Sequence, residues 1–335
     1  MSSKNSKPFF SIIIPTYNGA ERIRETLESI SSQDISKDLY EVIIVDDASP
    51  SEMAPLIDTI NKSFLHIINL RTIRCKTNRR RGGALNLGFS EAKGKYLLNI
   101  DDDDLFIEDS LSSLFNILTK HHLDVLMYDS NRLEDDKLNN EFRFPKNTEK
   151  ILSGEQFLQC QQISWTTWHY AINRDFLIKN NIKFAENVLF EDVDFSLSLI
   201  SNAKSIMYLH KQILTHVIRK GQITQVGKNL NKIEDLFKCA QRTENLASSF
   251  KNEPLTSSII QNHAIYQYKI MLKRYVWRLN YKDIKTIIKK NKPRNKLNLA
   301  FYDFMYKNPS IFLTISIILK ILVPYLLKMK KLLKI

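Results

Sequence analysis

Four consecutive aspartates form a group that could bind a metal ion: Asp101, Asp102, Asp103 and Asp104. They directly follow residues 96–100, an apolar run typical of a buried strand. Like charges this close repel one another unless a cation or protons compensate them. Carboxylate oxygens suit Mg²⁺ or Mn²⁺, which proteins commonly hold with one or two carboxylates and the phosphates of a nucleotide. The run therefore indicates a divalent-metal site; the alternative is a solvated acidic turn that caps the following helix.

A second acidic pair, Asp46 and Asp47, ends another apolar run in the same way. At a strand end, a carboxylate can accept a hydrogen bond from the base or ribose of a nucleotide, as acidic residues do in nucleotide-binding α/β folds. The alternative is an Asx turn, in which the side chain bonds only to nearby backbone. The pair therefore indicates nucleotide binding only in combination with the aspartate run.

Residues 1–130 predict the sheet that would hold these carboxylates. Short β-branched apolar runs alternate with amphipathic segments, the pattern of parallel strands covered by helices. We expect strands at 9–14, 41–45, 66–70, 95–100 and 124–128, helices at 23–30, 85–92 and 108–121, and a further helix opening near Glu191. The carboxyl ends of parallel strands meet at one edge of an open sheet, where ligands bind. The expected fold class is α/β, with a mostly parallel, Rossmann-like sheet flanked by helices.

Four motifs in this order resemble the inverting nucleotide-sugar glycosyltransferases of family two. They are Ser11-Ile-Ile-Ile-Pro-Thr-Tyr-Asn18, Val45-Asp-Asp-Ala-Ser49, Gly94-Lys-Tyr-Leu-Leu-Asn-Ile-Asp-Asp-Asp-Asp104 and Phe190-Glu-Asp-Val-Asp194, and the resemblance extends over residues 9–225. One such motif is weak, whereas four in register are specific. The resemblance implies a GT-A fold, a nucleotide-sugar donor and a divalent metal.

The resemblance also implies a donor site at the strand ends. The residues that would bind the nucleotide-sugar are Pro15, Thr16, Tyr17, Asp46, Asp47, Asp101, Asp102 and Arg219. The first three would line the nucleoside pocket, and Asp47 would contact the base. Asp101 and Asp103 match the two aspartates of the DxD motif, and the metal ligands implied are Asp103, Asp101 and Asp104. Arg219 lies in a segment, 216–224, that resembles the one closing over the diphosphate, whose charge it would neutralise.

A general base is implied as well. Asp192 matches the family's base, and Glu191 would orient it or the acceptor. An inverting transfer is a single displacement, in which a base takes the proton of the attacking hydroxyl, so one base suffices. Apolar residues follow Asp192 along its helix, so partial burial could raise its pKa toward a useful value. The alternative is that both carboxylates only stabilise the N-terminus of a helix.

Two positions depart from the family pattern. Leu85 stands where the family often has the arginine of Ala-Arg-Asn, so that contact is in doubt, although three arginines at 79–81 are close in sequence. Gln222 stands where a serine is common. Neither change removes a catalytic group.

An aromatic cluster precedes the expected base: Trp165, Trp168, His169 and Tyr170. Aromatic faces stack on the apolar faces of sugars, so Trp168 and His169 are candidate acceptor contacts. The alternative is a packed core, because tryptophan and tyrosine bury large areas. The sequence leaves both interpretations open.

The formal charge of +13 belongs to the last quarter of the chain. Residues 251–335 contain 18 basic and 3 acidic residues, whereas residues 1–250 contain 31 and 33. With 43% apolar and 25% charged residues, the composition excludes a disordered or polytopic membrane protein. Three cysteines without metal-ligand spacing fit a reducing compartment, and the apolar run at 9–14 is too short for a signal peptide.

The C-terminal segment predicts contact with a membrane surface. Residues 310–327 are apolar apart from the central Lys320 and a few hydroxyls, and a central lysine costs about 2.5 to 3.5 kcal/mol on insertion, which disfavours a span. In an amphipathic helix at about 309–335, lysines would lie opposite isoleucine and leucine, the pattern of a helix on an anionic surface. The alternative is packing on the protein's own core or on a dimer partner. We expect a catalytic domain at 1–227, with a nucleotide-sugar half (1–128) and an acceptor half (129–227), and a helical, basic region at 228–335.

The sequence thus predicts an inverting glycosyltransferase, peripheral on the cytoplasmic face of a membrane, that uses a UDP-sugar and Mn²⁺ or Mg²⁺. The expected acceptor is a saccharide or lipid-linked saccharide in surface glycan assembly. One alternative is a nucleotidyltransferase, but residues 15–19 lack the Gly-rich, basic loop it would need after the first strand. Another is a basic nucleic-acid-binding protein, but the C-terminal region contains no recognisable module, so no nucleic acid partner is expected. The motifs do not encode the sugar, the linkage or the oligomeric state.

Overall fold

The computed structural model describes residues 7–141, 150–160, 163–219 and 230–274. The chain divides into two compact units, Met1–Gln225 and Val226–Ile335. The expected base and the carboxylate-bearing strand ends fall in the first unit.

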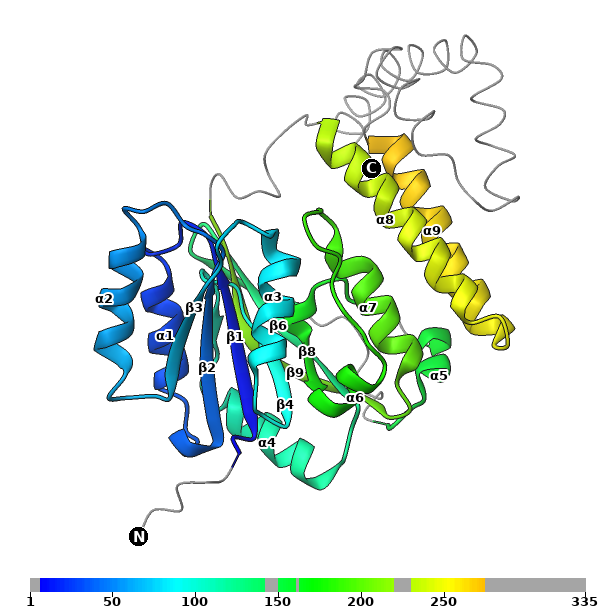
Figure 1. Ribbon diagram of the computed structural model, residues 1–335. Helices are drawn as coiled ribbons and strands as arrows, with labels where there is room; N and C mark the ends of the chain where they lie inside the picture. Colours follow the sequence, from blue (N-terminus) through cyan, green and yellow to red (C-terminus); the bar gives the residue numbers. More distant parts are fainter. Residues whose placement is uncertain (1–6, 142–149, 161–162, 220–229, 275–335) are drawn as a thin grey trace, which may run out of the picture. The chain divides into compact units, whose positions relative to one another are not determined.

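The first unit alternates strands and helices around one mixed sheet (Figure 1). Its elements are β1 (Phe10–Thr16), α1 (Ile23–Ser31), η1 (Lys37–Leu39), β2 (Tyr40–Asp46), α2 (Ala54–Phe64), β3 (Leu70–Arg74), α3 (Arg80–Glu91), β4 (Tyr96–Asn99), β5 (Leu105–Phe106), α4 (Ser110–Lys120), β6 (Val125–Glu134), β7 (Lys137–Glu141), α5 (Gly154–Cys160), η3 (Thr167–His169), β8 (Tyr170–Asn173), α6 (Arg174–Lys179), α7 (Glu191–Asn202) and β9 (Ile206–Ile218). The strand order is β3-β2-β1-β4-β8-β6-β9-β5, with β7 paired to β6. The half from β3 to β4 is parallel, as predicted, and β8 then joins in the antiparallel sense.

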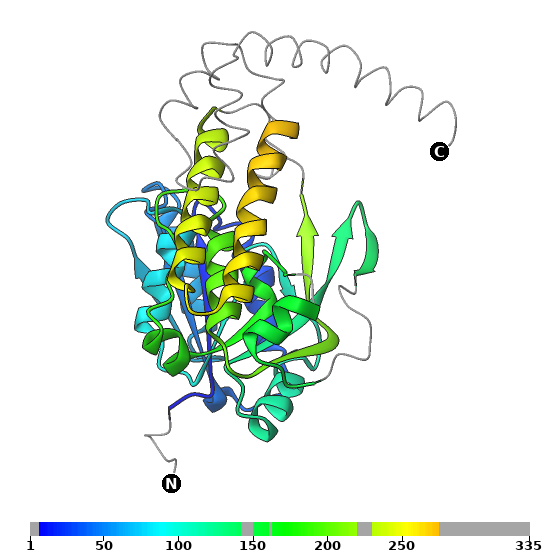
Figure 2. The same cartoon turned by 90° about the vertical axis from the view of Figure 1, so that its right-hand side faces the viewer.

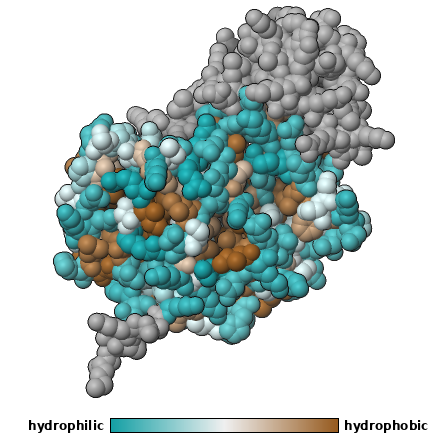
Figure 3. All heavy atoms as spheres, in the orientation of Figure 1, coloured by the Kyte–Doolittle hydropathy of each residue, from teal (hydrophilic) through white to brown (hydrophobic). Residues whose placement is uncertain are grey.

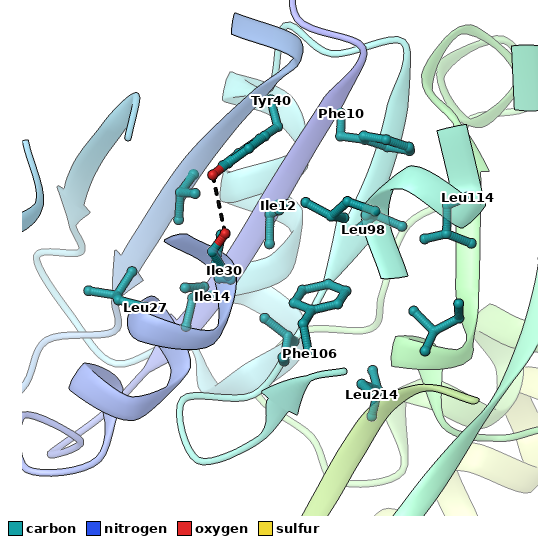
Figure 4. Close-up of a cluster of buried hydrophobic side chains, with 14 of the residues drawn as sticks. Phe10, Ile12, Ile14, Leu27, Ile30, Tyr40, Leu98, Phe106, Leu114 and Leu214 are labelled. Carbon is teal, nitrogen blue, oxygen red and sulfur yellow. Dashed lines mark hydrogen bonds between the residues drawn. The ribbon is translucent and has the colours of Figure 1, made fainter. Parts of the chain in front are cut away.

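Alternate residues of β1 point to opposite faces of the sheet, as the period of a strand requires. Phe10, Ile12 and Ile14 are fully buried in a core that α1, α2 and α4 cover (Figure 4). The Tyr40 hydroxyl, inside the same core, donates to the Ile30 carbonyl at 3.2 Å. This face is thus closed by apolar packing, and one buried hydroxyl finds its partner at the end of α1.

Helix α3 covers the opposite face of β1 and β2. A Cβ at Gly88 would lie 2.5 Å from Ile13 Cγ2, so only glycine lets the helix come this close to the sheet. Phe89 of α3 meets Phe184 at 5.9 Å between ring centroids, and Phe184 stacks on Phe195 of α7 at 3.7 Å. Through these rings, α3 links the parallel strands to the helix that carries the expected base.

The strand expected at 66–70 was wrong, because β3 begins only at Leu70 and runs to Arg74. Ile67 and Ile68 both donate their backbone N–H to the Phe64 carbonyl, so they complete the end of α2, a helix that the sequence pattern did not predict. As a result, the strand ends at Arg74 beside Asp46, four residues further along than the prediction.

The second unit contains α8 (Leu230–Ser249) and α9 (Pro254–Arg274), which lie side by side in both views (Figures 1 and 2). Both helices agree with the helical pattern expected from residue 228. The Gln267 side chain of α9 exchanges hydrogen bonds with the Thr243 hydroxyl of α8 at 3.2–3.3 Å. The expected amphipathic helix at 309–335 lies outside the described residues.

No helix within the described ranges is long and apolar enough to cross a membrane. On the face of the molecule shown in Figure 3, hydrophilic side chains predominate and apolar ones gather in separate patches.

Candidate active site

The ends of β1, β2 and β4 meet at one edge of the sheet. Thr16 is paired with Asp46 in the register of β1 and β2, and the Asp47 backbone N–H donates to the Thr16 carbonyl at 2.9 Å. The Thr16 hydroxyl also donates to Asp102 Oδ2 at 2.5 Å, which ties β1 to the residues that follow β4. The structure therefore brings together the nucleotide-binding and metal-binding motifs expected from the sequence.

Asp46 and Asp47 are held differently at the end of β2. Asp46 is fully buried, and its carboxylate accepts from Arg74 Nε at 2.7 Å and from the Ser49 N–H at 2.9 Å. Asp47 accepts from the Arg79 N–H at 2.8 Å, and burial raises its pKa above the ordinary value. Tyr17, just beyond Pro15 and Thr16, is 52% exposed, so its ring is available to a ligand whereas Asp46 is bonded within the protein.

Two of the four consecutive aspartates point into the protein. Asp102 accepts from Thr16 and from Arg22 Nη2 at 3.3 Å. Asp104 is fully buried, and its Oδ1 lies 3.0 Å from both His216 Nδ1 and the Val217 N–H. Burial raises the pKa of each carboxyl to about 6. These contacts join the end of β4 to β1 and to β9.

The other two aspartates retain partly exposed side chains, 25% for Asp101 and 17% for Asp103. Asp101 pairs with Arg81 Nε at 2.9 Å, and Asp103 lies 3.6 Å from Nη1 of Arg219. Arg219 also donates to the Asp103 carbonyl at 2.6 Å. The predicted diphosphate contact and the DxD motif are therefore neighbours in space.

The donor set at this edge fits a divalent metal shared with a phosphate ligand. Within the described ranges no three histidine, cysteine or acidic side chains are grouped as a metal cage. Mg²⁺ and Mn²⁺ do not need such a cage, since they are commonly held by one or two carboxylates together with substrate phosphates. Asp101 and Asp103 are the pair that could hold the ion, because both carboxylates are partly open.

The expected base opens helix α7. Glu191 is buried, and its Oε1 lies 3.6 Å from Arg81 Nη1. Asp192 is half-buried; burial and the neighbouring Glu191 charge raise its pKa to about 7, against the opposing effect of Arg81. A half-buried carboxylate with such a pKa can both reach a substrate and take a proton near neutral pH.

From the sequence, Arg81 was named only as one of three arginines close to the missing family arginine, yet it contacts both halves of the site. It contacts Asp101 at the end of β4 and Glu191 at the start of α7. Its only signal in the sequence is its position in a run of three arginines followed by two glycines, close before the strand that carries the aspartates. His216, the partner of Asp104, was noted only as the first residue of the segment 216–224.

Two members of the aromatic cluster, His169 and Trp168, differ in how deeply they are buried. His169 is fully buried, and its ring nitrogens bond to Ser130 Oγ at 2.8 Å and to Ser164 Oγ at 2.7 Å. We therefore place His169 in the packed core, because a buried side chain cannot meet an acceptor. Trp168 is half-buried, and its ring stacks on that of His216 with 5.2 Å between centroids.

Residues other than glycine that adopt left-handed backbone beside the site include Ala48 (φ 61°), Arg80 (φ 59°) and Phe190 (φ 61°). Each directly adjoins a site residue, namely Asp47, Arg81 or Glu191 in turn. Left-handed backbone is costly for such side chains and gathers at functional sites, where the surrounding structure maintains it. The positions of these left-handed residues therefore also indicate that the functional site lies at this edge of the sheet.

Comparisons with known proteins give one family. The family model described as glycosyl transferase family 2 matches residues 11–181. Over 203 residues the chain is 30% identical to the poly(ribitol-phosphate) β-N-acetylglucosaminyltransferase TarS of Staphylococcus aureus, a match that covers 60% of this chain and 34% of TarS. The chain thus spans about a third of the length of that relative.

Solved structures share the fold. The crystal structure of residues 1–349 of S. aureus TarS with UDP-GlcNAc superposes with a TM-score of 0.64 at 20% identity, covering 84% of this chain and 81% of that one. The mannosyltransferase PcManGT of Pyrobaculum calidifontis, in complex with GDP-Man and Mn²⁺, gives 0.52 at 14% identity, covering 95% and 88%. At these identities the likeness shows the fold alone, which is the GT-A arrangement expected from the sequence.

Proposed function

This chain belongs to glycosyl transferase family 2, and we propose that it transfers a sugar from a UDP-sugar to an acceptor hydroxyl, with inversion and with a divalent metal. The observation that supports this proposal most is the environment of Asp192. Its pKa is raised to about 7, and its neighbour Glu191 is connected through Arg81 to Asp101 at the edge where the donor would bind. A base suited to neutral pH thus adjoins a site suited to a diphosphate.

The proposed reaction is a single displacement. Asp192 takes the proton of the acceptor hydroxyl, whose oxygen forms a bond to the anomeric carbon of the donor. The bond between that carbon and the phosphate oxygen breaks at the same time, and UDP leaves from the opposite face. A metal held by Asp101 and Asp103 would offset the negative charge of the leaving diphosphate. Arg219, beside Asp103, would add a second positive charge there.

The nature of the substrates is proposed from the family and its relatives. TarS structures contain UDP-GlcNAc in one case and UDP in another, which supports a UDP-sugar donor. TarS is named for transfer to poly(ribitol-phosphate), which supports a polymeric or carrier-bound acceptor. We propose a saccharide or lipid-linked saccharide in surface glycan assembly.

We also propose that the enzyme works at the cytoplasmic face of a membrane, held there by its basic C-terminal region. The support comes from the sequence, in which 18 of the 21 charged residues at 251–335 are basic. Anionic head groups attract such a segment by roughly 1 kcal/mol per basic residue near the surface.

A donor panel tests the reaction. Purified protein is incubated with UDP-GlcNAc, UDP-GalNAc, UDP-glucose, UDP-galactose or GDP-mannose, with Mn²⁺ or with EDTA, and nucleotide release and melting temperature are measured. We expect one UDP-sugar to raise the melting temperature most, since a ligand at 100 times its Kd stabilises by about 2.7 kcal/mol. We expect slow UDP release from that donor with Mn²⁺ and none with EDTA.

Two results would contradict the proposal. Absence of stabilisation by every nucleotide-sugar and by UDP would exclude a donor site of this kind. Formation of a nucleotide-sugar from a nucleoside triphosphate and a sugar phosphate would instead identify a nucleotidyltransferase.

A further inference from the structure

Arg81 contacts carboxylates on both sides of the site, Asp101 after β4 and Glu191 at the start of α7. Its Nε lies 2.9 Å from Asp101 Oδ1, and its Nη1 lies 3.6 Å from Glu191 Oε1. Both terminal nitrogens also lie 3.2 Å from the Thr167 hydroxyl. A guanidinium is planar and always charged, so contacts on several of its edges fix its orientation as well as its position.

An aromatic ring completes the surroundings of Arg81. The guanidinium carbon lies 5.5 Å from the centre of the Trp168 ring, within the range of a cation–π interaction. The same ring stacks on His216, which in turn bonds to Asp104. Arg81 therefore contacts residues at the end of β4, in η3 and at the start of α7. Through the Trp168 ring, this cluster also reaches His216 near the end of β9.

The local backbone is shaped to bring Arg81 to this place. Arg80, the residue before it, adopts left-handed backbone with φ 59°. A Cβ at Gly82, the residue after it, would lie 2.5 Å from the Ala185 carbonyl oxygen and 3.0 Å from Glu191 Cγ. Only glycine lets the first turn of α3 approach the Ala185 carbonyl this closely, so the backbone on both sides of Arg81 is constrained, by a left-handed residue before it and by a close approach after it.

Arg81 also balances the charge of its carboxylate neighbours. Asp101, Glu191 and Asp192 share a partly buried region in which like charges repel one another. The guanidinium opposes this repulsion, and it acts to lower the pKa of both Glu191 and Asp192. Without this compensation, the carboxylates at the N-terminal turn of α7 and after β4 would repel one another.

We propose that Arg81 is a positioning residue for sugar transfer: it holds Glu191, and with it the turn that carries Asp192, at a fixed place relative to Asp101. The inference rests on the function proposed above. It predicts that Arg81 acts through Glu191 on the catalytic step, rather than by binding the donor nucleotide.

The test is a double-mutant cycle. Arg81→Met, Glu191→Gln and the double variant are compared with wild type in UDP release from the best donor of the panel with Mn²⁺, in UDP binding by calorimetry and in metal-free melting temperature. Arg24→Met, which alters an exposed arginine of α1, is the matched control. Arg81→Lys keeps the charge without the planar fork, and it serves in the cycle if Arg81→Met does not fold.

We expect Arg81→Met to lower kcat about 100-fold, because a shift of about 1 Å in a catalytic group has an effect of that size. Arg81→Lys should lower kcat about 10-fold, and UDP affinity should stay within about threefold in both. Because the two residues act as one unit, the double variant should be no more than about threefold slower than the slower single variant. Adding Glu191→Gln should also raise the melting temperature of Arg81→Met, since it removes an unpaired charge. The control should match wild type.

Three outcomes would overturn the inference while leaving the proposed function intact. The first is wild-type kcat in Arg81→Met and Arg81→Lys. The second is a double variant whose loss equals the product of the single losses. The third is a loss of UDP affinity as large as the loss of kcat, which would make Arg81 a donor-binding residue. If wild type neither binds UDP nor releases it from any donor, the proposed function itself is wrong.

Discussion

The four consecutive aspartates differ sharply in what surrounds them. Asp101 and Asp103 are partly exposed and lie beside arginines, whereas Asp104 is fully buried against His216 and the Val217 N–H. The sequence could predict that this run would lie at the mouth of the sheet, because an apolar strand precedes it. It could not predict which carboxylates turn inward, since Asp102 is bonded to Thr16 and Arg22, and Asp104 to β9, all about eighty or more residues away along the chain.

Substitutions should separate these two kinds of aspartate. Asp104→Ala removes a buried acceptor of two hydrogen bonds, and we expect a loss of about 3 kcal/mol in the free energy of unfolding. Asp103→Ala should cost less than about 1 kcal/mol, because its side chain is partly exposed. Denaturant unfolding of metal-free protein measures both. Asp104→Asn, which keeps one acceptor oxygen, should recover part of the loss; equal stability of the two alanine variants would contradict this division.

Asp103→Ala should instead weaken the Mn²⁺-dependent part of UDP binding, because Asp103 is one of the two carboxylates that could hold the ion. We expect the variant to bind UDP equally with Mn²⁺ and with EDTA, whereas wild type should bind more tightly with Mn²⁺. Calorimetry under both conditions makes the comparison. Asp192→Asn serves as the control, because it lies outside the metal site and should keep the wild-type metal effect. A full metal effect in Asp103→Ala would exclude Asp103 as a ligand.

The pH dependence of UDP release tests Asp192 as the base. Burial raises its pKa from 3.8 to about 7, so the proton is bound more tightly than in an ordinary aspartate. The base must be deprotonated to act; activity should therefore be full above this pKa and fall about tenfold per pH unit below it. Asp192→Asn should show no turnover at any pH and nearly wild-type UDP affinity. A rate that stays constant down to pH 5, or robust turnover by Asp192→Asn, would exclude this assignment.

At the scale of elements, the contact between α3 and α7 places the charged groups of the site. Gly82→Ala introduces a Cβ 2.5 Å from the Ala185 carbonyl oxygen and 3.0 Å from Glu191 Cγ, which would push α3 away from Ala185 and from Glu191 at the start of α7. We expect a loss of about 1 to 3 kcal/mol in stability, as for other overpacked sites, together with a large loss of kcat per folded molecule.

Gly88→Ala is the matched control for this contact. It lies on the same helix and makes an equally close approach, 2.5 Å, but to Ile13 Cγ2 in the sheet rather than to the Ala185 carbonyl. We expect a similar loss of stability with nearly normal kcat per folded molecule. Chemical unfolding and UDP release, both measured below the melting temperature, distinguish the two. If Gly82→Ala kept normal kcat, the approach of α3 to α7 would have no catalytic importance.

The elements that the sequence predicted well are those with a strong apolar period. The strands β1, β2 and β4 and the helices α1, α3, α4 and α7 follow from local pattern, and only their ends shift by a few residues. The strand β3 was placed too early because the apolar residues Ile67 and Ile68 look like strand but complete α2 through bonds to Phe64. The local apolar pattern cannot distinguish a strand from the end of a helix when the hydrogen bonds that decide between them go to the preceding helix.

Candidate site residues could be named from the sequence only where they stand in motifs. Asp47, Asp101 and Asp192 were named because each follows a strand or opens a helix in a recognisable stretch. Arg81 and Thr167 could not, since their role arises from three elements that meet in space. Among neighbouring arginines, the sequence offers no way to tell which one turns toward the carboxylates.

At the scale of the whole molecule, the excess of basic residues and the candidate catalytic residues lie in different parts of the chain. The first 250 residues carry 31 basic and 33 acidic residues and include every candidate catalytic group, whereas residues 251–335 carry 18 and 3. Lysines on one side of an amphipathic segment attract anionic lipid while its apolar side enters the interface. We therefore expect the C-terminal region to set where the enzyme works and the first unit to set what it does.

Vesicle binding tests this division of roles. We expect the full chain to bind phosphatidylglycerol-containing vesicles and to lose at least about 100-fold in affinity when five C-terminal lysines become glutamine, at roughly 1 kcal/mol per lysine. These are Lys320, Lys328, Lys330, Lys331 and Lys334. The matched control changes five exposed lysines of the first unit, namely Lys93, Lys120, Lys179, Lys183 and Lys204.

The control variant should keep vesicle binding, because its lysines lie outside the segment that we expect to meet the lipid. Both variants should release UDP from the panel donor at the wild-type rate in the absence of vesicles, since neither alters the site. Salt should weaken vesicle binding of the wild-type chain, because ions screen charges at a surface. If the control lost as much vesicle affinity as the C-terminal variant, only net charge would matter and the amphipathic arrangement would have no role. If the chain instead bound RNA or DNA more tightly than vesicles in parallel titrations, the basic region would serve nucleic acid and the membrane proposal would be wrong.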